Sequence, residues 1–103
     1  MTLVTESEIR QSVAEIENSS GTAIRKARLL VRLARYVRKE ALRLAQGAAI
    51  LASDCMDEQA ERLNVAMQRL LDLDDEIRVR ARALLANSSR ESNTAIASLL
   101  MSH

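Results

Sequence analysis

Apolar residues recur along residues 22–51 in alternating steps of four and three, which is the spacing of a heptad seam. The series has no polar exception: Ala23, Ala27, Leu30, Ala34, Val37, Ala41, Leu44, Ala48 and Leu51. Residues 55–86 repeat the spacing, with Asp74 as the single polar member. Each stretch therefore predicts a long helix. Residues 52–55 are too few for anything but a reversal, so the pattern predicts an antiparallel hairpin.

Shorter helices are predicted on both sides of this hairpin. Thr5 and Glu8 have capping-box spacing ahead of an amphipathic stretch, which predicts a helix over residues 6–17. Polar residues 87–89 predict an end to the second long helix, and a last short helix is expected over residues 89–101. The fold class is all-α, with residues 1–103 as one domain.

The seams also predict a register. One heptad position of the first long helix is entirely alanine, and facing it with larger residues gives the pairs Ala27–Leu84, Ala34–Ile77, Ala41–Leu70 and Ala48–Leu63. Alternating large and small side chains fill the space between two helices evenly. This register places Arg35 near Glu76 and Lys39 near Asp72, and a slip of one heptad remains an alternative.

Composition indicates that the hairpin needs a further surface. The chain has no Pro, two Gly and a single aromatic residue, Tyr36, so its core is built from small aliphatic side chains. A domain of this size with so little buried area is marginally stable. We therefore expect the bundle to be completed by a second copy of the chain, as a homodimer, or by another protein.

Two features of the sequence bear on location. Cys55 has no partner for an internal disulfide, which favours a reducing compartment. Residues 1–8 lack the pattern of a secretory signal, and no apolar run reaches the length of a membrane span. We expect a cytoplasmic protein without a transmembrane segment.

Charge is distributed in blocks: residues 21–50 carry eight bases and one acid, and residues 51–77 carry eight acids and two bases. Six bases form one ridge of the first long helix, namely Arg25, Arg28, Arg32, Arg35, Lys39 and Arg43. Such a ridge is suited to nucleic-acid phosphates. The favoured alternative is neutralisation by Asp72, Asp75 and Glu76 and by the acidic first helix.

The open end of the hairpin is the better candidate for a free basic patch. There Arg25, Lys26 and Arg28 are expected to meet Arg78, Arg80 and Arg82. Either the first helix or an acidic partner must cover this cluster. The candidate contacts to an anion or nucleic acid are Arg25, Lys26, Arg28, Arg32, Arg80 and Arg82.

Catalytic chemistry has little support. Asp74 is interpreted first as an edge carboxylate that reaches solvent and second as a residue that fixes the register. Cys55 lies beside Asp54 and Asp57, which disfavour a thiolate, and His103 ends the chain. No catalytic residue, cofactor or metal ligand is predicted.

The sequence is best interpreted as a non-catalytic helical protein–protein interaction module, such as an adaptor, a small chaperone or an assembly subunit. The partner-binding residues are expected to be Leu29, Leu33, Tyr36, Leu71, Leu73, Ile96, Leu99 and Leu100, which lie outside the two-helix seam. Nucleic-acid binding through the basic ridge is the alternative. A small helical enzyme with an arginine-lined anion site ranks third.

Overall fold

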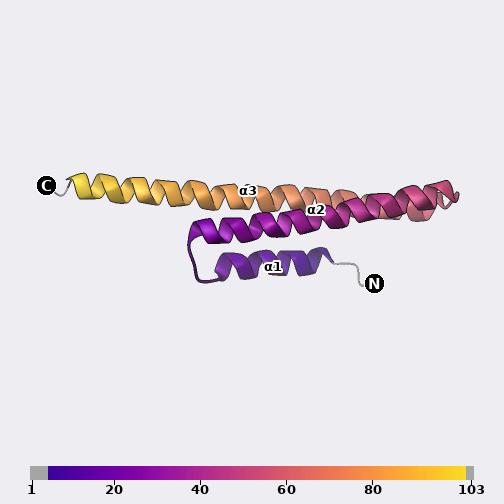
Figure 1. Cartoon of the computed structure of the whole chain (residues 1–103), viewed down its shortest axis with the longest axis horizontal. Helices are drawn as coiled ribbons and strands as arrows, with labels where there is room; N and C mark the ends of the chain where they lie inside the picture. Colours follow the sequence, from indigo (N-terminus) through magenta and orange to yellow (C-terminus); the bar gives the residue numbers. More distant parts are fainter. Residues whose placement is uncertain (1–4, 102–103) are drawn as a thin grey trace.

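A computed structural model describes the backbone of residues 5–101 and the side chains of residues 5–88. This part of the chain forms three helices: α1 (Glu6–Asn18), α2 (Ala23–Ser53) and α3 (Asp57–Met101). Helices α2 and α3 run antiparallel along a rod of 74 × 19 × 15 Å, and α1 folds back beside them (Figure 1). The predicted all-α hairpin with a short N-terminal helix is confirmed.

The helix ends follow the local sequence. Thr5 Oγ1 accepts a hydrogen bond from the Glu8 amide at 3.2 Å, as its spacing predicts, and Thr22 accepts one from the Arg25 amide at 3.1 Å. At the hairpin turn, the Met56 amide donates to the Leu51 carbonyl at 2.8 Å while Cys55 takes a φ of 61°. This is a Schellman ending, with Cys55 in the position usually held by glycine.

Two details of the predicted boundaries differ. The second long helix begins at Asp57 rather than at residue 55, and Asp54 is the C-cap residue of α2. The predicted break at residues 87–89 and separate last helix are wrong, because α3 continues for 45 residues to Met101. Asn and Ser inside a helix cost only about 0.5 kcal/mol each. Ending the helix there would leave four carbonyl groups without helical partners, and no Gly or Pro follows to force it.

The core lies along the α2–α3 seam. All seven α2 seam residues from Ala27 to Ala48 are buried, opposite Ala60, Leu70, Asp74, Ile77 and Ala81 of α3. A Cβ atom on Gly47 would lie 3.2 Å from Leu63 Cδ1, which agrees with the predicted Ala48–Leu63 layer. A slip of one heptad would move Leu63 about 10 Å along α2. The predicted register is therefore supported at this layer and the slipped one is not.

Helix α1 packs into one of the two grooves that flank this seam. Its Ile9 and Val13 are buried against the hairpin. Ion pairs link Arg10 to Glu76 at 3.2 Å and Glu17 to Arg80, and Lys26 Nζ donates to the Glu17 carbonyl at 3.0 Å. Both ends of α1 are thus tied to the hairpin through charge as well as apolar contact.

Candidate functional site

Two antiparallel helices leave a groove on each side of their shared seam, and α1 occupies only one of these. Between α1 and α3 a small hollow remains, lined by Arg10, Val13, Ala14, Leu73, Glu76, Ile77 and Arg80. A second hollow of about 400 Å³, which we call the open groove, shares none of these residues. It is lined by Ile24, Ala27, Arg28, Val31, Arg32 and Arg35 of α2 and by Leu85 of α3.

The open groove combines an apolar floor with a basic rim. Ala27, a buried seam residue, and Val31, which is half-buried, form its floor. Ile24 and Leu85 remain 52% and 42% exposed at its walls. Removing apolar side chains from water is favourable, so a molecule that covered Ile24 and Leu85 would gain binding free energy.

The arginines of the rim have no acidic partner among the described residues. Arg28, Arg32 and Arg35 are exposed and make no hydrogen bond or ion pair with another described side chain. Glu76, predicted to lie near Arg35, instead binds Arg10 and Arg80. The prediction that acids of α3 neutralise this ridge is therefore wrong for these three arginines.

Neighbouring bases of the ridge differ in their pairing. Arg25 and Lys39 likewise have no ion pair with a described residue, whereas Arg43 pairs with Glu40 at 3.2 Å. Asp72, expected near Lys39, accepts a hydrogen bond from Gln68 at 3.0 Å. Most of the positive charge of α2 therefore faces solvent.

The predicted cluster of six bases at the open end of the hairpin is partly covered. Glu17 of α1 binds both Arg80 and, through its carbonyl, Lys26. Arg78 is held by Asp74 within α3. Arg25, Arg28 and Arg82 keep no ion pair within the described part of the chain, so α1 covers one side of the cluster only.

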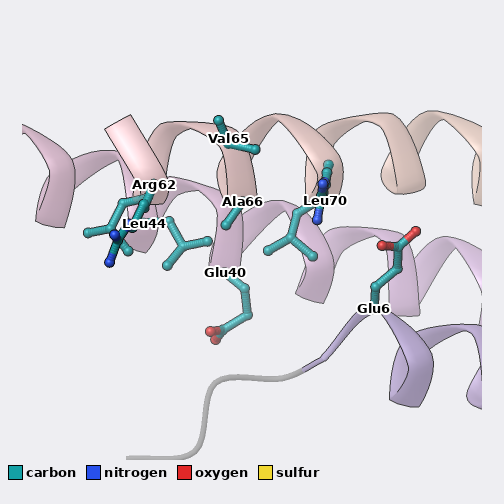
Figure 2. Close-up of a pocket in the computed structure, with 9 residues that line it drawn as sticks. Glu6, Glu40, Leu44, Arg62, Val65, Ala66 and Leu70 are labelled. Carbon is teal, nitrogen blue, oxygen red and sulfur yellow. The ribbon is translucent and has the colours of Figure 1, made fainter. Parts of the chain in front are cut away.

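A third hollow, of about 250 Å³, continues the covered groove beyond the start of α1 towards the hairpin turn. Its floor is apolar and includes Leu44 and Leu70, and Figure 2 shows Glu6 of α1 and Glu40 of α2 beside it. Arg62 and Arg69 also line this hollow, which we call the tip groove. Its rim carries both signs of charge, whereas the charged residues of the open groove are all arginines.

The predicted partner-binding residues differ in how far they are exposed. Leu73 is buried in the core and is not available to another protein. Leu29, Leu33 and Leu71 are half-buried, and Tyr36 is 44% exposed. Ile96, Leu99 and Leu100 lie outside the described side chains. Ile24 and Leu85 were missed as surface sites, although the seven-residue spacing of Ile24 and Val31 is visible in the sequence.

Asp74 does not reach solvent as the first interpretation predicted. Only 3% of the residue is exposed, and its Oδ1 accepts a hydrogen bond from Arg78 Nε at 3.0 Å. The burial of a carboxylate in an apolar seam requires such a donor. Asp74 lines none of the three hollows described above. Its hydrogen bond to Arg78 lies within α3, so the alternative role in fixing the register stays a prediction.

Arg10 of α1 lies between two carboxylates, those of Glu6 and Glu76. Its hydrogen bond to Glu76, followed by that to Glu6, raises the pKa of the guanidinium above its ordinary value. A guanidinium is always charged in proteins, and this one links the exposed surface of α1 to α3.

The hollows contain few groups suited to chemistry. The described residues that line the open groove include three arginines to hold an anion, but no carboxylate, thiol, hydroxyl or imidazole for proton transfer or nucleophilic attack. Among the side chains of residues 5–88, no three His, Cys, Asp or Glu residues gather as a metal site would require. Cys55 is exposed in the hairpin turn, and His103 lies outside the described residues.

No described helix contains a stretch that is both long and apolar enough to cross a membrane. No protein-family model, curated protein or solved structure matches the chain.

Proposed function

We propose that this chain is a non-catalytic helical protein–protein interaction module, acting as an adaptor, a small chaperone or an assembly subunit. The observation that carries the proposal is the open groove, in which Ile24 and Leu85 stay exposed beside the buried seam. The opposite groove of the same hairpin already accepts a helix, α1. A second helix, from another chain, is the natural occupant of the groove that remains.

The energetics suit such a contact. A fully buried Ile, Val or Leu side chain contributes about 1.5–3 kcal/mol. Ile24, Val31 and Leu85 are partly buried already, so covering them supplies a fraction of this value for each. The groove should therefore bind its partner with moderate affinity, as in reversible assemblies. The single thiol, Cys55, is exposed and favours a location in the reducing cytoplasm.

The double variant Ile24→Asp/Leu85→Asp tests the proposal. A charge at both walls makes burial of the groove unfavourable, so the variant is expected to lose whatever chain binds there. Solution mass by light scattering detects a second copy, and comparative purification of the full-length chain from its native source detects another protein. We expect wild type to show one or the other.

Val79→Asp is the matched control, because Val79 is exposed on α3 and lines none of the three hollows. It should behave as wild type in both measurements, with circular dichroism confirming that all variants are folded. A monomeric wild-type chain whose associated proteins are the same in the groove variant and the control would contradict the proposal.

Nucleic-acid binding is the second candidate, and the unneutralised ridge favours it. Arg25, Arg28, Arg32, Arg35 and Lys39 lie along one side of α2 without acidic partners among the described residues. If all five bind phosphates of duplex DNA, a fourfold rise in salt should weaken affinity by about 500-fold. Fluorescence anisotropy with labelled duplex and single strands at two salt concentrations measures this. Absent or salt-insensitive binding would exclude the ridge as a phosphate-binding surface.

A further inference from the structure

Helix α1 demonstrates what kind of helix the hairpin accepts. Residues 6–18 carry four acids and one base, and their buried face consists of small aliphatic residues such as Ile9 and Val13. One of these acids, Glu17, pairs with Arg80 of α3, and the one base, Arg10, pairs with Glu76 of α3. The covered groove thus binds an amphipathic helix through an apolar floor and through ion pairs at its rim.

The open groove presents a similar apolar floor on the other side of the seam, but the charged residues of its described lining are all arginines. Ile24 and Val31 are seven residues apart, which places them two helical turns and about 10 Å apart along α2. Arg28 and Arg35 repeat at the same interval, each four residues after an apolar residue. Apolar and positive positions therefore alternate along the groove at the period of a helix packed beside it.

From this charge and spacing we propose that the open groove binds an acidic amphipathic helix of a partner protein. The partner places apolar side chains two turns apart against Ile24, Val31 and Leu85. Its Glu or Asp side chains flank this stripe and pair with Arg28, Arg32 and Arg35, which have no acidic partner among the described residues. The inference specifies the partner chemistry of the proposed interaction module and rests on that function.

The apolar floor favours a protein helix over a nucleic acid. A phosphate backbone pairs with the arginines but leaves Ile24 and Leu85 against polar groups or water. Proteins without sequence-specific motifs bind the nucleobases of single strands mainly by stacking them on aromatic rings. No aromatic residue lines the groove, and Tyr36 is absent from its lining. An acidic amphipathic helix can cover the apolar floor with its own apolar side chains and pair its carboxylates with the arginines of the rim.

The probe for the test is a fluorescein-labelled, helix-stapled peptide of 15 residues, with Leu in two-turn repeats and Glu at the flanking positions. We expect the full-length chain to bind it, and we expect Arg28→Glu/Arg35→Glu to weaken binding about tenfold or more through charge repulsion. The same variant should bind a peptide with Lys in place of Glu more tightly than wild type does. A merely destabilised protein would not show that exchange of preference.

Arg62→Glu/Arg69→Glu is the matched control. It makes the same change in charge at the same seven-residue interval, but its positions line the tip groove. Its affinity for the Glu peptide should stay within about twofold of wild type, since exposed charges at a distance are screened by salt. Equal loss in both double variants would overturn the assignment to the open groove.

Four other outcomes would also overturn the proposal. Displacement of the bound peptide by duplex DNA, with a steep salt dependence, would assign the groove to nucleic acid. A wild-type dimer that dissociates in Ile24→Asp/Leu85→Asp would assign it to a second copy of the chain. If the peptide does not bind but a native partner is lost in Ile24→Asp/Leu85→Asp, the acidic chemistry of the partner is refuted and the interaction module is not. If the peptide does not bind and no native partner is lost in that variant, both proposals are refuted.

Discussion

Leu30→Ala is expected to lower the free energy of unfolding by about 2–5 kcal/mol, the usual cost of a cavity at a buried leucine. Leu30 is 0% exposed and is among the largest fully buried side chains of the described residues. The seam residues on either side of it in α2 are Ala27 and Ala34, whose methyl groups cannot move into the space that the substitution opens. The loss is large against the roughly 5–15 kcal/mol of a typical domain.

Leu42→Ala provides the control, because Leu42 lies on the same helix but is 59% exposed. It removes the same atoms and has the same effect on helix propensity, and its cost should stay within about 0.5 kcal/mol. Urea denaturation followed by circular dichroism measures both variants. Equal losses would show that Leu30 does not occupy a closely packed seam and would refute the packing described for α2 and α3.

Arg78→Met is expected to lower the free energy of unfolding by about 1–3 kcal/mol, because it leaves the Asp74 carboxylate without its donor. The buried site of Asp74 offers no other hydrogen-bonded base, whereas the Arg78 side chain is itself 29% exposed. That exposure makes the loss smaller than for a fully buried ion pair, for which removal of one partner costs about 3–5 kcal/mol.

The double variant Asp74→Leu/Arg78→Met separates the pair from the packing. With both partners replaced by apolar side chains, stability should return to the wild-type value or exceed it. The same denaturation series, read as a double-mutant cycle, gives the coupling between the two positions. A double variant that is less stable than Arg78→Met alone would mean that Asp74 makes a further essential contact. Hydrogen exchange along α3 then tests whether the apolar pair loosens the register.

Much of the fold could be predicted because its signals are local or strictly periodic. The starts of α1 and α2 depend on the side chains of Thr5 and Thr22, each of which accepts a hydrogen bond from an amide three residues later. The α2 seam repeats every seven residues. The end of α3 could not be predicted in this way. A polar triplet at residues 87–89 fits a helix interior as well as a helix end, and the choice depends on small differences in backbone hydrogen bonding.

The candidate site was less predictable. The ridge of arginines was visible as a pattern, but its pairing was not, because Glu76 can face either Arg35 or Arg10 depending on where α1 packs. Leu73 and Asp74 show the same limit. One was expected at a partner surface and the other in contact with solvent, and both are buried.

The amino-acid sequence alone determines that this protein forms two long helices joined by a tight turn, since heptad periodicity and the absence of proline leave few alternatives. Only the tertiary structure decides which groove α1 covers, and hence which charges remain without a partner. The physical reason is that a hairpin has two flanks of similar hydrophobicity. The choice between them follows from contacts such as Glu17–Arg80, which join residues far apart in the chain.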